Sequence, residues 1–289
     1  MSRRIGLLAG AGVLPRLVAE GMRDRDLQPV ILPFRGIADP DLRTLAEEWR
    51  PVGAMQLGSW IRQLRRGQCD QVVMVGKVDR AKLAHNPLAQ LRERPDWRAL
   101  RLWYRDLRRD RRTGNLVRAL AKELSNAGIE LMDSTTHISE HLAPQGLLAG
   151  PQVDAHTERQ LSFGAPLVQS LADSDVGQSL AVLGSDVLAV EAIEGTDAMI
   201  DRAGALAKGR SWTLFKTSAA NHDRRGDVPV IGPETIARVA QNGGKTVAVG
   251  AGRVILLEAE KVRSEANRLG VRLWGCLLYT SDAADDDTR

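Results

Sequence analysis

The chain has 289 residues, of which 43% are hydrophobic and 26% are charged, and its formal net charge is +4. This composition excludes a disordered or fibrous protein, and the length is sufficient for two domains with separate cores. The positive excess suits an anionic partner but does not decide between a nucleotide, a phospholipid and a nucleic acid.

The two cysteines, Cys69 and Cys276, stand in unrelated contexts and indicate neither a disulfide framework nor a CxxC metal site. A reducing, cytoplasmic environment is therefore expected. The apolar run near the N-terminus is interrupted by glycines, which favours a strand and a glycine loop over a signal peptide. No run approaches the ~20 apolar residues of a transmembrane helix, so any membrane contact is expected to be peripheral.

The N-terminal half alternates predicted strands with helices. Residues 4–8 have the pattern of a buried strand, and the glycine loop at 9–12 leads into a helix with apolar residues at helical spacing. The next elements are strands at 28–33, 52–57, 71–75 and 129–132 and a helix at 59–66. This alternation predicts a Rossmann-like, mostly parallel α/β sheet that binds ligands at the carboxyl ends of its strands.

Residues 87–127 are predicted to be helical throughout. Within them, residues 92–112 contain nine arginines interleaved with Trp97, Trp103 and Tyr104, a composition that could serve RNA or an anionic membrane surface. Interspersed aspartates dilute this charge, and the aromatics fall at the spacing of a helix core. A solvated helix face is the favoured interpretation.

A loop rich in glycine and proline marks the expected domain boundary. We place an N-terminal Rossmann-like domain at residues 1–134 and a C-terminal catalytic α/β domain at residues 135–275. Residues 276–289 resemble nothing before them and are interpreted as a non-native tail, outside the fold.

The C-terminal domain is predicted to contain a mixed sheet. Strands at 179–183 and 187–192 flank a Gly-Ser-Asp turn, which favours an antiparallel pair. The other elements are helices at 198–207, 233–241 and 259–269 and strands at 212–215, 246–249 and 254–257.

Carboxylates and cations gather in the loops beside these apolar strands. The acidic side chains supply the hard oxygen ligands that suit Mg²⁺, and the cations would neutralise phosphate oxygens. A surface network of salt bridges is the alternative. The acidic members are Asp173, Asp175, Glu194, Asp197, Asp223 and Asp227, and the basic members are Lys216, Arg224 and Arg225.

The loop at Gly10 and Gly12 lacks the third glycine of a dinucleotide fingerprint, and no acidic residue ends the second strand. Its backbone N–H groups at a helix N-terminus would still suit a phosphate or a uracil edge, although a tight turn without a ligand fits equally well. Lys77 follows the strand at 71–75, so its ammonium is expected at a strand's carboxyl end, with a solvated lysine as the alternative.

Several sequence blocks spread along the chain form a recognisable set. The blocks are Leu7-Leu8-Ala9-Gly10-Ala11-Gly12 with Pro15, Val75-Gly76-Lys77-Val78, Asp175-Val176-Gly177-Gln178, Glu191-Ala192-Ile193-Glu194-Gly195-Thr196-Asp197-Ala198-Met199, Lys216, and Asp223-Arg224-Arg225-Gly226-Asp227-Val228-Pro229-Val230-Ile231-Gly232-Pro233. Together they resemble the LpxI family, the UDP-2,3-diacylglucosamine pyrophosphatases of lipid A biosynthesis. The resemblance runs from about residue 3 to residue 275.

The resemblance implies Mg²⁺-dependent hydrolysis of UDP-2,3-diacylglucosamine to UMP and 2,3-diacylglucosamine 1-phosphate (lipid X), with water attacking the β-phosphorus. It also implies a homodimer, a glycolipid partner in place of nucleic acid, and transient contact with the inner membrane surface.

The resemblance also assigns roles to residues. Asp227 becomes the leading catalytic carboxylate, either as a metal ligand or as the base that orients water. The other roles are metal binding for Glu194 and Asp197, catalysis or metal binding for Asp223, a phosphate clamp for Lys216 and Arg224, and substrate binding for Gly10, Gly12, Lys77, Gln178 and Thr196.

Two other classes of function remain open from the residues alone. One is a Rossmann-like, NAD-binding oxidoreductase, which the missing third glycine opposes. The other is a non-enzymatic nucleotide- or RNA-binding module that uses the arginine-rich helix, and it predicts an affinity that falls steeply with salt.

Overall fold

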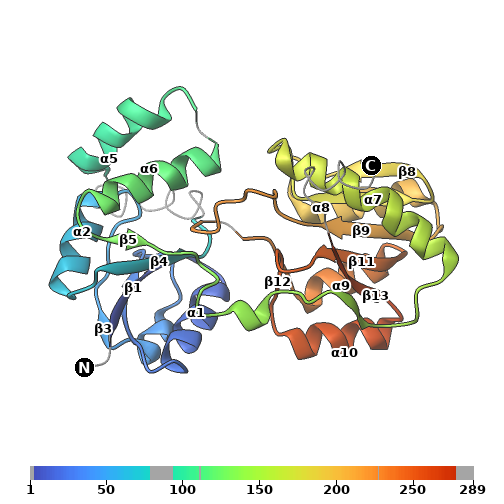
Figure 1. The fold of residues 1–289 in the computed structure, drawn as a ribbon, viewed down its shortest axis with the longest axis horizontal. Helices are drawn as coiled ribbons and strands as arrows, with labels where there is room; N and C mark the ends of the chain where they lie inside the picture. The colour runs from blue at the N-terminus through green and yellow to red at the C-terminus, as the bar shows by residue number, and fades with distance from the viewer. Residues whose placement is uncertain (1–2, 79–93, 111, 227, 278–289) are drawn as a thin grey trace, which may run out of the picture. The chain divides into compact units, whose positions relative to one another are not determined.

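The structure is a computed structural model that describes residues 3–78, 94–110, 112–226 and 228–277. The chain divides into two compact units (Figure 1). The first unit comprises Met1–Ser139 and Asp223–Asp227, and the second comprises Glu140–His222 and Val228–Arg289. Among the described residues, no helix combines the length and the apolar character needed to cross a membrane.

The first unit is built on a five-stranded parallel sheet with the strand order β3-β2-β1-β4-β5, which confirms the predicted Rossmann-like architecture (Figure 1). The chain runs outward from β1 through β2 to β3 and then returns to place β4 on the other side of β1. The order therefore reverses between β1 and β4, where such sheets bind ligands. The strands are β1 (Arg4–Ala9), β2 (Gln28–Pro33), β3 (Glu48–Trp49), β4 (Gln71–Val75) and β5 (Glu130–Leu131).

Helices complete the first unit. One buried cluster joins the sheet to α2, α5, η2 and α6, and it includes Trp60, Leu64, Leu107 and Leu124. The helical segments are α1 (Leu14–Arg23), η1 (Pro40–Leu45), α2 (Leu57–Arg66), α5 (Trp97–Leu102), the π turn η2 (Trp103–Leu107) and α6 (Thr113–Ser125). The short 3-10 helix η3 (Ser139–His141) begins at the last residue of this segment of the first unit and continues into the second.

The predicted strand at 52–57 is wrong. Val52 forms only an isolated bridge with Phe34, and the chain turns directly afterwards into α2. Gly53 stabilises this turn, because its carbonyl oxygen accepts hydrogen bonds from the backbone N–H of Gln56 (3.1 Å) and from the Trp60 indole (2.7 Å).

The continuous helix predicted over 87–127 is also wrong in its described part. The chain leaves the helical path after η2 and begins α6 at Thr113. The Asn115 side chain holds this break together by donating to the carbonyl oxygens of Asp106 (3.0 Å) and Asp110 (2.9 Å). Residues 87–93 and 111 of this prediction lie outside the described residues.

The second unit contains a six-stranded mixed sheet with the order β6-β13-β11-β9-β7-β8, as the predicted hairpin indicated. A short parallel pair, β10 with β12, lies outside this sheet. The strands are β6 (Gly146–Ala149), β7 (Ser179–Leu183), β8 (Asp186–Val190), β9 (Trp212–Lys216), β10 (Val230–Ile231), β11 (Gly244–Gly250), β12 (Ile255–Leu256) and β13 (Arg272–Cys276).

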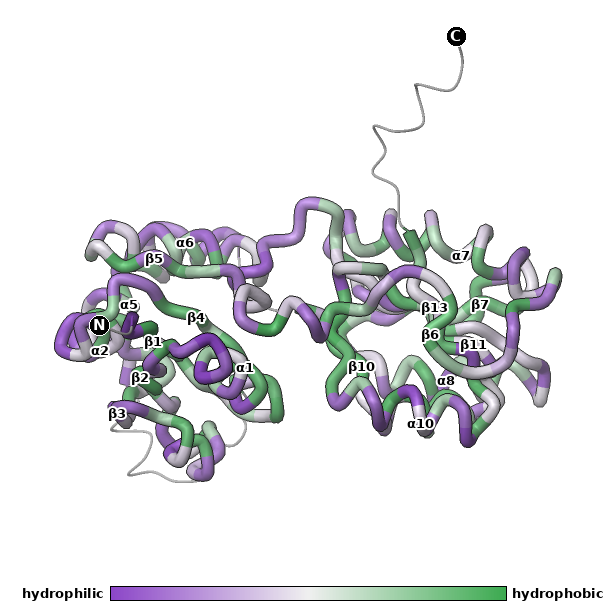
Figure 2. Tube along the Cα trace, turned by 60° about the horizontal axis from the view of Figure 1, so that its bottom comes forward, coloured by the Kyte–Doolittle hydropathy of each residue, from purple (hydrophilic) through white to green (hydrophobic). Residues whose placement is uncertain are grey.

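Two buried clusters connect this sheet to its helices. Helices α8 (Thr196–Ala207), α9 (Pro233–Gln241) and α10 (Ala259–Leu269) share one cluster, whereas α7 (Ala155–Asp173) packs through a second cluster around Phe215. Figure 2 shows hydrophobic colour on the strands and hydrophilic colour on the outer turns of α10. The sequence analysis did not predict α7.

Strand β13 corrects the interpretation of the C-terminus. Cys276, which the sequence analysis placed outside the fold, is the last residue of this strand and pairs with Gly250 of β11. Its side chain is buried. Residues 278–289 of the predicted tail lie outside the described residues.

Candidate functional site

The loops after β1 and β4 bring three of the predicted substrate-binding residues, Gly10, Gly12 and Lys77, to the same edge of the first sheet. The Gly10 N–H donates to the Val75 carbonyl oxygen (2.8 Å), and Ala11 and Lys77 exchange backbone hydrogen bonds of 2.8 and 2.9 Å. Because β1 and β4 are parallel neighbours, this edge lies at the point where the strand order reverses.

Both glycines have a structural reason to be glycine. A Cβ at Gly10 would lie 2.7 Å from backbone atoms of Gly76 and Lys77, and Gly12 adopts a φ of +100°. The N–H groups of Gly10 and Ala11 are already bonded within the chain, so they do not form the expected phosphate cradle. The exposed Lys77 side chain is a cation that this edge offers to an anionic ligand.

Part of the Asp-Arg-Arg block, Asp223–Asp227, belongs to the first unit. The Arg224 carbonyl oxygen accepts hydrogen bonds from the Ser134 backbone N–H (2.9 Å) and hydroxyl (2.7 Å). Ser134 follows β5, which pairs with β4, so this attachment is at the same edge of the sheet. A Cβ on Gly226 would lie 2.5 Å from Val117, so the block approaches α6 closely.

Asp223 forms an ion pair with Arg225. Both of its carboxylate oxygens accept from the guanidinium at 2.7 Å, and this pairing raises the pKa of Arg225. Asp223 is therefore bonded to a cation in the structure, which makes it a weak candidate for a direct metal ligand. Asp227, the leading catalytic carboxylate of the sequence analysis, lies outside the described residues.

The second unit holds a compact polar cluster, which we call the Lys216 cluster: Lys216, Thr196, Glu191 and Ser179. The Lys216 ammonium, at the end of β9, donates to the Thr196 hydroxyl (2.8 Å), which in turn donates to Glu191 Oε1 (2.9 Å). The Ser179 hydroxyl lies 3.4 Å from that of Thr196. Two predicted residues, Lys216 and Thr196, are thus in direct contact.

A backbone hydrogen bond places Gln178 next to the Lys216 cluster. Its carbonyl oxygen accepts from the N–H of Thr217, the residue after Lys216 (2.9 Å). The neighbouring Gly177 is forced to be small, since a Cβ there would lie 2.1 Å from the Glu191 carbonyl oxygen. The loops before β7 and after β8 therefore pack tightly around the Lys216 cluster.

Glu191 was not among the predicted site residues. Its second oxygen, Oε2, is buried and has no hydrogen-bond partner in the described part of the chain. A buried acceptor without a partner costs roughly 1–3 kcal/mol, so this atom is suited to receive a hydrogen bond from a ligand or from water. The available signal was its position as a carboxylate directly after the apolar strand β8.

The two predicted metal ligands nearby are already partnered by arginines. Glu194 accepts from Arg202 (2.6 Å), and hydrogen bonds from backbone N–H groups, its own first, lower its pKa. The Asp197 side chain is 72% exposed and lies 3.9 Å from Arg238. Within the described ranges, no three His, Cys, Asp or Glu side chains gather to hold a metal ion. Glu194 and Asp197 each lie beside an arginine in this arrangement, and their role as Mg²⁺ ligands stays a prediction.

Two family profiles divide the chain between them. The LpxI N-terminal domain matches residues 4–141, and the LpxI C-terminal domain matches residues 144–274. The chain belongs to the LpxI family. This confirms the resemblance drawn from the sequence blocks.

A relative is the UDP-2,3-diacylglucosamine pyrophosphatase LpxI of Caulobacter vibrioides. It is 29% identical to this LpxI-family chain over 281 residues, covering 94% of this chain and 97% of the relative. Among solved structures, glycinamide-RNase-transformylase T from Mycobacterium tuberculosis matches with 18% identity over 66% of this chain and a TM-score of 0.24. This chain covers only 44% of that structure, and so distant a likeness indicates neither the fold nor the function of this chain.

Proposed function

We propose that this LpxI-family chain hydrolyses the pyrophosphate of UDP-2,3-diacylglucosamine to UMP and 2,3-diacylglucosamine 1-phosphate in lipid A biosynthesis. The observation that carries the proposal is the similarity to the Caulobacter pyrophosphatase, which extends over nearly the whole of both chains. Matches to both family domains support it.

In the proposed reaction, water forms a bond to the β-phosphorus, the bridging bond to UMP breaks, and the water gives up a proton. Negative charge builds on the phosphate oxygens during this step. An ammonium held in place beforehand stabilises such charge, because it needs no reorganisation when the reaction occurs. Lys216 is such a group, since Thr196 fixes its position through the hydrogen bond of 2.8 Å.

Asp227 remains our proposal for the carboxylate that orients the attacking water, on the strength of the sequence resemblance alone. We also retain Mg²⁺ as the expected cofactor, which when bound would help to offset phosphate charge. Mg²⁺ is often held by one or two carboxylates together with substrate phosphates, so it does not require a cage made by the protein alone.

The competing functions have less support. The backbone hydrogen bonds from Gly10 to Val75 and from Ala11 to Lys77 occupy N–H groups that a dinucleotide-binding loop would offer to its ligand. An RNA-binding module would need neither the Lys216 cluster nor a substrate diphosphate. Binding of NADH or RNA without UMP release would favour these alternatives.

The experiment is release of UMP from detergent-dispersed UDP-2,3-diacylglucosamine by the purified chain, with Mg²⁺ or with EDTA. Lys216→Met should lower kcat by roughly 100-fold, the scale of losing one preorganised electrostatic group. Lys245→Met, which removes an exposed lysine in β11, is the matched control and should turn over normally. Equal rates in the two variants would refute the role of Lys216, and a folded wild type without UMP release would refute the function.

A further inference from the structure

The outward face of α5 and η2 carries large apolar side chains. Trp97 is 77% exposed, Tyr104 is 68% exposed and Leu100 is 38% exposed. Their spacing places them on one side of the helical segment, while Leu102 and Leu107 are buried in the core on the other. The spacing had predicted that the aromatics would enter the core, so this part of the sequence interpretation is wrong. A patch of this kind marks an interaction surface.

Ion pairs connect this apolar face to α6. Together with Arg101 and Arg105, the three side chains line a hollow of about 540 Å³. The buried carboxylate of Glu123 on α6 fixes both arginines, at 3.4 Å from Arg101 and 2.9 Å from Arg105.

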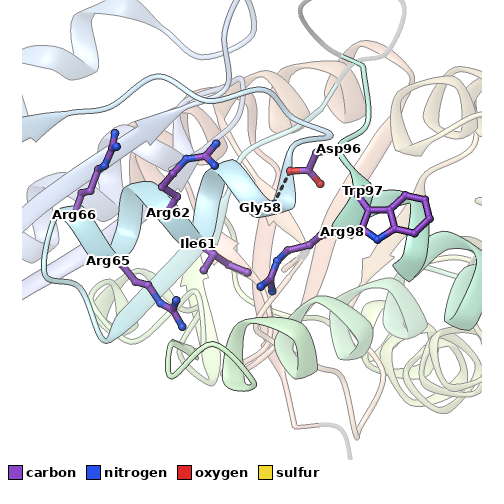
Figure 3. Close-up of a pocket in the computed structure, with 8 residues that line it drawn as sticks. All are labelled: Gly58, Ile61, Arg62, Arg65, Arg66, Asp96, Trp97 and Arg98. Atoms are coloured by element: carbon purple, nitrogen blue, oxygen red, sulfur yellow. Dashed lines mark hydrogen bonds between the residues drawn. The ribbon is translucent and has the colours of Figure 1, made fainter.

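A basic pocket of about 700 Å³ adjoins this face at Trp97, which lines both hollows. Arg62, Arg65 and Arg66 come from α2 and Arg98 from α5. In Figure 3 the Arg98 side chain extends from α5 towards α2, and the Trp97 side chain points away from α2. In the part of the chain that the structure describes, Arg62, Arg66 and Arg98 have no carboxylate partner.

The acidic residue in the pocket does not cancel this charge by ion pairing. Asp96 is used by the fold, because its two oxygens accept from backbone N–H groups at the start of α2 (Gly58, 2.7 Å) and of α5 (Ala99, 3.0 Å). These bonds fix the two helices relative to each other. The arginines are therefore presented outward beside the aromatic face.

We propose that this combined surface, which we call the α2–α5 face, docks on an anionic lipid bilayer. Trp97, Leu100 and Tyr104 would enter the headgroup region, which Trp and Tyr favour, and Arg62, Arg66 and Arg98 would contact lipid phosphates. A bilayer fits better than RNA because the aliphatic Leu100 and the apolar hollow match acyl chains, not bases. This docking proposal rests on the proposed function, because the two-chain lipid substrate of that reaction resides in a membrane.

The test is sedimentation of the full chain with vesicles of phosphatidylcholine alone or mixed with phosphatidylglycerol. Wild type should sediment with the mixed vesicles only. The double variant Trp97→Ser/Arg98→Gln should lose at least tenfold in partitioning, whereas Arg43→Gln/Leu206→Ser, an exposed pair elsewhere, should bind as wild type. Thermal unfolding of all three proteins checks that they fold.

Retained vesicle binding by Trp97→Ser/Arg98→Gln would overturn the proposal. Binding of polyuridylate without vesicle binding, lost in the same variant, would overturn it in favour of an RNA surface. Turnover of detergent-dispersed substrate should be unchanged in both double variants, which separates docking from catalysis. A wild type that binds vesicles but releases no UMP would refute the proposed function and leave the docking surface standing.

Discussion

At the scale of single residues, the Thr196 hydroxyl occupies a central position in the candidate site. It accepts a hydrogen bond from Lys216 and donates one to Glu191, and it stands at the first position of α8. One hydroxyl thus couples a cation that could stabilise phosphate charge to a carboxylate with one unsatisfied oxygen. Removing it should disturb both neighbours.

We expect Thr196→Val, which keeps the shape and removes the hydroxyl, to lower kcat by about 10–100-fold, the scale for losing a group that orients a catalytic ligand. The free energy of unfolding should fall by ~1–3 kcal/mol, because the half-buried Lys216 and Glu191 each lose a hydrogen-bond partner. UMP-release kinetics and urea denaturation measure the two effects. Thr136→Val, which removes an exposed hydroxyl bonded to the Asp133 carbonyl oxygen, is the control and should change neither. Normal turnover in Thr196→Val would contradict the coupling.

At the scale of elements, the Lys77 edge of the first unit depends on close approach between the loops after β1 and β4. A Cβ at Gly10 would meet backbone atoms of Gly76 and Lys77, which cannot move aside as a flexible side chain would. The mutual backbone hydrogen bonds of Ala11 and Lys77 depend on this contact. The position of Lys77 therefore rests on Gly10.

Gly10→Ala should lower the free energy of unfolding by ~1–3 kcal/mol or more, the usual cost of overpacking. Gly114→Ala offers a matched control, because Gly114 lies in α6 and a Cβ added there would have nothing within 4 Å of it. It should be neutral or stabilising by up to ~1 kcal/mol through helix propensity. Urea denaturation measures both, and equal stabilities would show that the Gly10 contact does not matter.

The burial of both cysteines, one of them in strand β13, predicts how their thiols react. Burial raises the pKa of both Cys69 and Cys276 to about 12, so neither thiol should react with a disulfide reagent at about pH 8 in the native protein, while both should react in urea. Because each thiol has a higher pKa in the folded protein than in the unfolded chain, keeping it protonated in the fold adds to the free energy of unfolding. This contribution is complete below about pH 8.5 and is lost as the pH rises towards 12. Rapid native labelling of Cys276 would contradict its place in the sheet.

At the scale of the whole molecule, hydrophobic periodicity predicted the two α/β sheets and most of their elements. It failed at α7, where Gly164 and Pro166 interrupt the helical pattern; Gly164 is needed because its Cβ would lie 2.3 Å from the Phe215 ring. It also failed at the aromatic face of α5, because spacing shows which residues share a side but not which side is buried.

The candidate site was only partly accessible from the sequence. Strand ends pointed to Lys77 and Lys216, and the structure places both there. The arginine partners of Glu194 and Asp197 come from other positions of the fold, so no local pattern indicates that these carboxylates are already paired. Glu191 was missed because the burial of its Oε2 atom without a hydrogen-bond partner results from tertiary packing, which the sequence does not show.

The most direct test of the proposed function is hydrolysis of UDP-2,3-diacylglucosamine in water labelled with heavy oxygen, followed by mass spectrometry of both products. We expect UMP release that EDTA and Asp227→Ala abolish, with the label in the sugar phosphate because water attacks the β-phosphorus. Label in UMP would contradict the site of attack. A folded wild-type chain that releases no UMP would contradict the function itself.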